Sequence, residues 1–277
     1  IFRHGEKEKL PPAGKSGDEE VLLTPSGRKG AMERGEVFCL PAEGLAQAVA
    51  MGSPRKRAQE TAAFVMGGSE ETVSGTESID ELKAKLDAGR EYGSKIGTDK
   101  RLDFDAGSPD FEKAMMAAYK EGRLIEWMVN DSDRVAKEVG DEKGSTYSRE
   151  AAGVAEIVKK YSGISKRFNE LVNTKGYQDT MQRFLGTHQS VGESFLVKVI
   201  EKIQGVEERD AFVKAVKKTG FDFVEGFQVE IRAQKGKDTP GLEVRFVKRD
   251  QDGKLIFEFN EPLPVEVLEE IIAEGKP

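Results

Sequence analysis

The chain has 277 residues, of which 34% are charged and 37% are hydrophobic, and its formal net charge at pH 7 is −7. This length is sufficient for one large α/β domain with a sizeable insertion and an ordinary hydrophobic core. An acidic chain lacks the general positive surface that nucleic acids and anionic membranes attract, so we expect neither as a partner. Any phosphate site must therefore be built locally. No run of 18 apolar residues occurs, so the sequence predicts no transmembrane helix.

The single cysteine, Cys39, has no second thiol for an intrachain disulfide and no histidine at metal-ligand spacing, so we expect a small buried side chain. Ile1 and Phe2 have the character of a buried strand, and we expect that strand to begin upstream of residue 1. No signal peptide is visible in the sequence. We expect a cytoplasmic protein, with a cleaved export signal upstream of Ile1 as the alternative.

Three segments share the order of a short apolar strand, a turn that carries a polar side chain, and a helix. The expected strands are the one that contains Ile1 and Phe2, residues 46–51 and residues 180–187, and helices are expected at 54–66 and 191–203. This order predicts an α/β fold, a three-layer sandwich with a mostly parallel central sheet and helical crossovers.

Local signals set the helix ends near the start of the chain. Thr24 is a good N-cap and Pro25 suits the first helical position, so a helix is expected from there to about Phe38. The helix that begins near residue 54 is expected to stop at Gly67 and Gly68.

Residues 84–178 are rich in charge and in helix formers, and 111–119 and 154–161 show helical periodicity. We interpret this stretch as a helical insertion within one domain that covers residues 1–277. The alternative is a helical layer that packs on one face of the sheet.

The last part of the chain changes character again. Residues 227–233, 242–248 and 255–259 alternate apolar and polar side chains, which predicts a β-rich C-terminal extension of antiparallel strands. Asp252-Gly253 predicts a hairpin turn between the last two strands, and a short helix is expected at 264–274. The acidic residues here lack the further ligands of a calcium loop.

The chain has only two histidines, and each follows an expected strand. His4 lies in Arg-His-Gly at residues 3–5, and His188 follows the strand at 180–187. Between them, Ser-Pro-Arg-Lys-Arg-Ala-Gln-Glu-Thr-Ala occupies residues 53–62, after the second strand. Open α/β sheets place ligand sites at the carboxyl ends of their strands, so we expect these segments to meet.

Together with Leu-Thr-Pro-Ser-Gly at residues 23–27, these motifs resemble the histidine phosphatase superfamily, which includes the cofactor-dependent phosphoglycerate mutases. That family has Arg-His-Gly after its first strand, Leu-Thr-x-x-Gly at a helix start, Ser-Pro-x-x-Arg-Ala-x-x-Thr-Ala after its second strand, and a second histidine after a later strand. All four occur here in order. The resemblance covers about the first 70 residues and residues 180–204. It implies that the insertion lies over the catalytic pocket and selects the substrate.

The chemistry of these residue types points to phosphoryl transfer. A neutral imidazole can attack a phosphoryl group and form a phosphohistidine, which splits one difficult displacement into two easier ones. We expect His4 in this role. Guanidinium forks match phosphate oxygens, and Arg3 and Arg57 would supply them, with His188, when protonated, as a further donor. Gln189 is expected to bind substrate beside His188.

The resemblance does not assign a role to several charged residues near the motifs. The match assigns the pocket arginine to Arg57, and Arg55 and Lys56 are expected to be solvated residues of the helix. Glu6 and Lys7 would either line the entrance to the site or belong to a solvated loop.

The general acid that protonates the leaving group is the least defined part of the site. The acid phosphatase branch of the superfamily has an aspartate directly after the second histidine, where this chain has Gln189. The mutase-like branch takes a glutamate from the loop after the second motif, and Ile-Asp-Glu-Leu at residues 79–82 resembles that setting. Glu81 is therefore the expected acid, with Asp103, Asp105 and Glu193 as competitors.

The sequence thus predicts a metal-independent phosphatase that hydrolyses small phosphomonoesters through a phosphohistidine on His4. A phosphoglycerate mutase is the alternative enzyme, and a phosphate- or phosphoprotein-binding module without turnover is the alternative from another class. We expect no cofactor and no catalytic metal, because His4 and His188 are both assigned to phosphoryl transfer.

Overall fold

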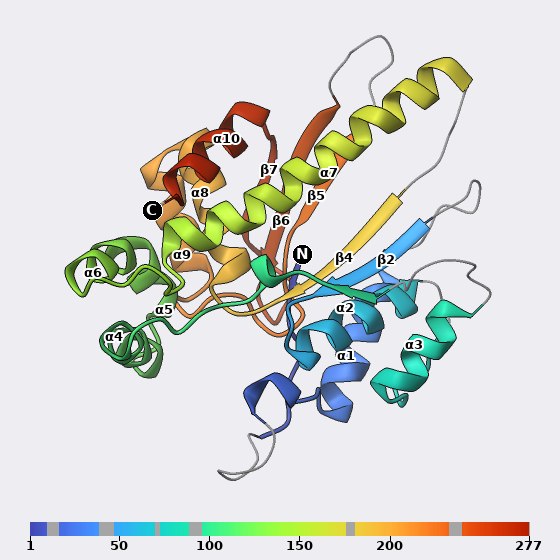
Figure 1. Cartoon of the computed structure of the whole chain (residues 1–277), viewed down its shortest axis with the longest axis horizontal. Coiled ribbons are helices and arrows are strands. Elements are labelled where there is room, and N and C mark those ends of the chain that lie inside the picture. The colour runs from blue at the N-terminus through green and yellow to red at the C-terminus, as the bar shows by residue number, and fades with distance from the viewer. Residues whose placement is uncertain are drawn as a thin grey trace. The chain divides into compact units, whose positions relative to one another are not determined.

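The structure is a computed structural model that describes residues 1–9, 17–38, 47–69, 73–88, 96–175, 181–232 and 240–276 (Figure 1). Cys39 and Ala46, about which predictions were made above, lie outside these residues. The chain divides into two compact units. The first comprises Ile1–Asp103, Gln178–His188 and Asp222–Glu225, and the second comprises Phe104–Tyr177, Gln189–Phe221 and Gly226–Pro277.

The first unit contains a sheet of four parallel strands in the order β1-β4-β2-β3. The strands are β1 (Phe2–Arg3), β2 (Gln47–Gly52), β3 (Ile96–Thr98) and β4 (Met181–Thr187). The predicted parallel sheet is confirmed, and the two predicted strands after β1 end within one residue of their expected ends. The strand β3 was not predicted, because its three residues carry too short an apolar pattern to be distinguished from a loop.

The first unit also contains helices. They are η1 (Asp18–Glu20), α1 (Pro25–Glu36), α2 (Lys56–Ser69), α3 (Ile79–Asp87) and η2 (Lys100–Leu102). In Figure 1, α2 lies along β2 and β4, and α1 packs on α2. Their shared core is apolar and includes Phe2, Leu23, Phe64 and Phe184.

The predicted start of α1 is confirmed, since the Thr24 hydroxyl accepts a hydrogen bond from the Gly27 N–H at 3.0 Å. The predicted stop of α2 at Gly67 and Gly68 is wrong, because the helix continues to Ser69. A Cβ atom on Gly68 would overlap the carbonyl oxygen of Met32 in α1. This glycine is present because the two helices touch there.

The second unit combines helices with an antiparallel sheet. Its helices are α4 (Pro109–Lys120), α5 (Leu124–Trp127), η3 (Met128–Ser132), α6 (Asp133–Glu138), α7 (Tyr147–Lys175), α8 (Val191–Gln204), α9 (Val206–Ala215) and α10 (Val265–Glu274). Its strands pair in the order β5-β6-β7, with bounds Gln228–Arg232, Gly241–Arg249 and Leu255–Pro262. The helical periodicities, the β-rich extension and the terminal helix are all confirmed.

The turn between β6 and β7 is the predicted hairpin turn. Gly253 has a φ of +78°, a region in which glycine is at little disadvantage, and the Asp250 N–H donates to the Lys254 carbonyl at 2.9 Å. The Asp250 carboxylate accepts from the N–H groups of Asp252 and Lys254, so it stabilises the turn itself.

No helix among the described residues combines the length and the apolar character that crossing a bilayer requires. The segment predicted as an insertion, residues 84–178, contains α4 to α7, but its residues Ile96–Thr98 form a strand of the parallel sheet. A single domain with an insertion in this range stays a prediction.

The contact between β4 and α2 gives a first test. A Cβ atom on Gly186 would overlap the carbonyl oxygen of Ala58, so Gly186→Ala should lower the free energy of unfolding by about 1–3 kcal/mol, the usual cost of overpacking. Gly30→Ala is the matched control, because a Cβ atom there meets nothing within 4 Å and α1 should gain about 0.5–1 kcal/mol. Urea denaturation of both variants measures this difference. Equal stabilities would show that the close approach of α2 to β4 does not constrain the fold.

Candidate functional site

The candidate site lies where three parallel strands end. The His4 N–H donates to the Thr187 carbonyl at 2.9 Å, and the Ser53 N–H donates to the Gly186 carbonyl at 3.2 Å. This register brings the ends of β1, β2 and β4 together and places the imidazole ring centroids of His4 and His188 5.2 Å apart. The expectation that the motif segments meet is fulfilled for these two histidines.

The Arg-His-Gly segment is tied to α2 through Thr61, the threonine of the Arg-Ala-x-x-Thr motif. The Thr61 hydroxyl accepts from the Gly5 N–H at 2.9 Å and donates to the Arg57 carbonyl at 2.8 Å. One buried hydroxyl therefore connects the loop that carries His4 to the first turn of the helix that carries Arg57.

The Leu-Thr-x-x-Gly motif supports the same loop from the other side. The Thr24 N–H donates to the Glu6 carbonyl at 2.9 Å, and a Cβ atom on Gly27 would overlap that carbonyl oxygen. The buried Glu60 carboxylate in α2 accepts from the Leu23 N–H at 2.6 Å and pairs with Arg28 at 3.1 Å. Together with the N-cap bond of Thr24 and the two hydrogen bonds of Thr61, the lack of space at Gly27 gives a physical reason for the residue type at three motif positions.

His4 has the protonation state and the tautomer of a nucleophile. Its Nδ1 lies 2.8 Å from the Gly5 carbonyl oxygen, which can only accept, so Nδ1 carries the proton and Nε2 keeps its lone pair. Burial lowers the pKa of His4 to about 3, and the nearby charges of Arg57 and Arg3 act in the same direction. The imidazole is therefore neutral across the physiological pH range.

His188 is held through Nε2. This nitrogen lies 2.6 Å from the Ser53 hydroxyl and 3.4 Å from the Asp103 carboxylate. The Thr187 hydroxyl donates to the Leu102 carbonyl at 2.7 Å, which fixes Asp103 beside the end of β4. Burial lowers the pKa of His188 well below its ordinary value of 6.5, which favours the neutral ring, and its role as a donor to an anion stays a prediction.

Three cations converge on the carboxylate of Asp18, the first residue of η1. Arg57 is buried and donates to the Asp18 carboxylate at 2.9 Å and to its carbonyl at 2.7 Å. Lys7 donates to the same carboxylate at 3.2 Å, and Arg55 forms a short ion pair with it. Burial disfavours the charged carboxylate, but Arg57 and Lys7 outweigh that effect and lower the pKa of Asp18 to about 2.

Arg55 corrects a prediction. It was expected to be solvated, but its side chain is only 14% exposed and pairs with Asp103 at 2.7 Å as well as with Asp18. The motif pattern carried no signal for this, because the pairing depends on a carboxylate 48 residues further along the chain. Asp18 and Ser53 were also not predicted as site residues, although Ser53 belongs to the second motif.

Glu81 stays a prediction as the acid, but its local structure differs from the expected loop. Ser78 and Glu81 form a capping box at the start of α3, in which the carboxylate accepts from the Ser78 N–H at 2.8 Å and from its hydroxyl at 2.9 Å. These hydrogen bonds lower the pKa of Glu81. The Ser-x-x-Glu signal for this cap is present in the sequence.

The other predicted residues belong to the second unit and have partners within it. The Gln189 side-chain amide donates to the Thr219 carbonyl, and the buried Glu193 carboxylate accepts from the Phe221 N–H at 2.7 Å. The Asp105 carboxylate accepts from the Gly107 N–H at 2.8 Å. Their roles as substrate ligand or acid stay predictions.

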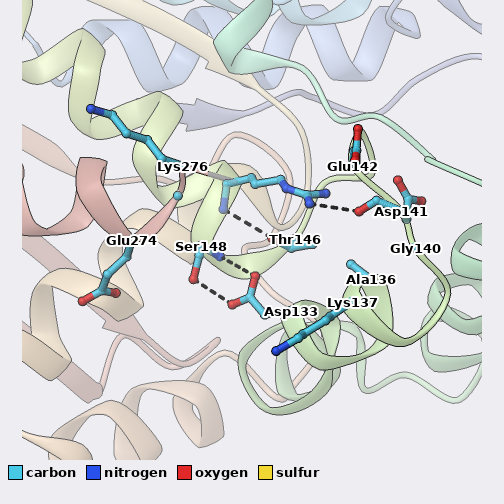
Figure 2. Close-up of a pocket in the computed structure, with 12 residues that line it drawn as sticks. Asp133, Ala136, Lys137, Gly140, Asp141, Glu142, Thr146, Ser148, Glu274 and Lys276 are labelled. Atoms are coloured by element: carbon cyan, nitrogen blue, oxygen red, sulfur yellow. Dashed lines mark hydrogen bonds between the residues drawn. The ribbon is translucent and has the colours of Figure 1, made fainter.

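The second unit has a pocket of its own (Figure 2). Its lining includes Asp133, Lys137, Ser148 and Glu274, and the Ser148 hydroxyl donates to the Asp133 carboxylate at 2.7 Å. None of the predicted site residues lines it. Among the described parts of the chain, no three side chains of His, Cys, Asp or Glu are grouped as metal ligands would be.

No protein-family model and no curated protein sequence matches this chain. Among solved structures, it is similar to the mycobacterial glucosyl-3-phosphoglycerate phosphatase, with 13% identity, coverage of 94% of this chain and 95% of that chain, and a TM-score of 0.44. A complex of that phosphatase with VO3 shows 14% identity, coverage of 94% of each chain and a TM-score of 0.41. A structure described as mycobacterial hydrolase 1 shows 14% identity, coverage of 95% of each chain and a TM-score of 0.41. These identities and TM-scores are too low to carry a function over to this chain, so a functional proposal must be argued from its own residues.

The Asp18 cluster leads to a test of anion binding. A carboxylate held by Lys7, Arg55 and Arg57 competes with any external anion for the same donors, so Asp18→Asn should bind inorganic phosphate about tenfold more tightly, a change of about 1.4 kcal/mol. Isothermal titration calorimetry at two salt concentrations measures this. Glu20→Gln, in the same turn and paired with Lys56, is the control and should bind phosphate as the wild type does. Weaker binding in Asp18→Asn would instead show that Asp18 holds Arg57 in place.

Proposed function

We propose that this protein is a phosphatase that hydrolyses phosphomonoesters through a phosphohistidine on His4. The observation that supports this most directly is a neutral imidazole whose Nδ1 is held by a carbonyl, with its ring 5.2 Å from that of His188. The ordered motifs that resemble the histidine phosphatase superfamily agree with this proposal. Arg57 and His188 belong to one connected group of side chains, because Arg57 pairs with Asp18, Arg55 pairs with both Asp18 and Asp103, and His188 lies beside Asp103. The reaction class is phosphoryl transfer with two displacements.

In the first displacement, Nε2 of His4 forms a bond to phosphorus while the bond from phosphorus to the ester oxygen breaks. Arg3, Arg57 and a protonated His188 would stabilise the charge on the phosphoryl oxygens. The departing oxygen takes up one proton. In the second displacement, a water oxygen attacks the phosphohistidine and gives up one proton to the carboxylate that protonated the leaving group. Inorganic phosphate then leaves, and His4 regains its free Nε2. The protein needs no base to activate His4, because its pKa of about 3 keeps the imidazole neutral.

We propose Asp103 as the donor of the leaving-group proton. Its carboxylate lies 3.4 Å from Nε2 of His188 and 2.7 Å from the Arg55 guanidinium, within the group of side chains that would bind the phosphoryl group. The Glu81 carboxylate instead accepts from the N–H and the hydroxyl of Ser78 in the cap of α3, so its hydrogen bonds serve the helix start and not the group around His188. Glu81 remains the alternative on the basis of its motif.

The nucleophile is tested by His4→Ala, which should abolish turnover of 4-nitrophenyl phosphate. With labelled substrate, a denaturing alkaline quench should leave label on the wild type and none on His4→Ala. An alkaline quench is required because phosphohistidine is labile in acid. Lys56→Ala, which changes an exposed residue of α2, should retain both label and turnover. Label on His4→Ala would assign the nucleophile to another residue, and phosphate binding without turnover in the wild type would favour a binding module.

The proton donor is tested by its dependence on the leaving group. A poor leaving group needs the proton most, so Asp103→Asn should slow hydrolysis of glycerol phosphate by about 10²–10⁴-fold and that of 4-nitrophenyl phosphate by much less. Glu81→Gln should leave both rates within about twofold. Steady-state kinetics of both variants on both substrates gives the four rates.

Two outcomes contradict this assignment. If Glu81→Gln gives the leaving-group-dependent loss and Asp103→Asn does not, the proton comes from Glu81. If Asp103→Asn slows both substrates equally, Asp103 positions His188 or Arg55 and donates no proton. Vanadate affinity, measured in parallel, reports whether the cations are still in place.

A further inference from the structure

A short segment far along the chain pairs with β1 inside the first unit. The Arg3 N–H donates to the Glu225 carbonyl at 2.9 Å, and the Val224 N–H donates to the Arg3 carbonyl at 3.2 Å. Both main-chain polar groups of Arg3 are therefore bound by residues 222–225. This segment lies 34 or more residues after His188 in the sequence, so no motif predicted it.

The turn in this segment is strained in a specific way. Val224 has a φ of +59°, and a β-branched residue in the left-handed region is a genuine outlier of backbone conformation. Its side chain is buried in the core of the first unit with Phe2. The turn is closed by the Glu225 N–H, which donates to the Asp222 carbonyl at 3.1 Å. Burial of Val224 thus holds the preceding residue in a fixed place.

That preceding residue is Phe223, and it lies against the two residues that open the site. The centroid of its ring is 6.1 Å from that of His4 and 4.8 Å from the guanidinium carbon of Arg3. Phe223 is 50% exposed as a residue, whereas Phe2, Phe64 and Phe184 of the same unit are buried. An isolated exposed phenylalanine needs no explanation, but this one is fixed by a strained turn beside a nucleophile.

We propose that Phe223 is a specificity-determining residue that stacks on a flat ring of the substrate's leaving group, so that the enzyme prefers aryl phosphates to alkyl phosphates. The substrate class deepens the phosphatase function proposed above and rests on it. A phosphoryl group bound by Arg3 carries its ester substituent close to the ring that lies on the same guanidinium. Offset or edge contacts between aromatic rings add to affinity beyond the burial of area.

Phosphonates test this ring contact without turnover. Phenylphosphonate and methylphosphonate share the anionic group, have no ester bond to hydrolyse, and differ in the ring. We expect the wild type to bind phenylphosphonate about tenfold more tightly than methylphosphonate, as measured by isothermal titration calorimetry. Phe223→Ala should abolish this preference while methylphosphonate affinity stays within about twofold. Phe223→Leu, which keeps apolar area but not the ring, should show an intermediate preference.

Kinetics provide the second readout. Phe223→Ala should raise KM for phenyl phosphate about tenfold and leave KM for glycerol phosphate within about twofold. Tyr119→Ala removes a comparably exposed ring from α4, 52% exposed, and should change neither value.

Each result decides between defined roles. Equal loss of both phosphonates in Phe223→Ala would show that the ring only holds Arg3, and an unchanged preference would show that it does not contact the ligand; either result overturns the proposal. If the wild type turns over neither ester, the phosphatase function fails, and the phosphonate titrations still decide whether Phe223 contacts an aromatic ligand.

Discussion

The register of three parallel strands around Gly186 is the constraint on which the candidate site depends. Gly186 pairs with Phe2 of β1 on one side and with Gly52 of β2 on the other, and it faces the backbone of α2. A shift of one residue in either pairing would move a histidine or Ser53 away from the group and would turn its side chain to the other face of the sheet. The close packing of glycine at this point therefore determines which side chains meet.

The positive charge at the site comes from a few neighbouring side chains, because the chain as a whole is acidic. Without a bound anion, burial favours the neutral form of both imidazoles, so positive charge comes from guanidinium and ammonium groups, whose high pKa values tolerate partial burial. In the structure, three of these cations are held by the single carboxylate of Asp18. A chain with a net charge of −7 thus concentrates cations at one point and supplies its own anion to them.

The sequence allowed prediction of those parts of the site that follow strand ends and short motifs. His4, His188 and Arg57 lie next to strands or helices whose apolar pattern is clear, and the parallel order of those strands brings them together. Arg55 was misjudged, and Asp18 and Phe223 were missed, because each depends on a contact between segments distant in the chain. For Glu81, by contrast, the sequence carried two local signals. The residues around it resemble the motif of the catalytic glutamate, and Ser78 to Glu81 also form the pattern of a helix cap.

In the proposed mechanism, the nucleophile and the proton donor depend on their surroundings to different degrees. The nucleophile needs no base to become reactive, because burial and the nearby charges of Arg57 and Arg3 keep His4 neutral. The proton donor depends on its surroundings, since Asp103 is bound by Arg55 and approached by His188. A phosphoryl group that binds the guanidinium of Arg55 competes with Asp103 for the same N–H donors and loosens that pair. In this scheme, substrate binding itself prepares the acid, and the reaction would couple protonation of the leaving group to correct occupation of the anion site.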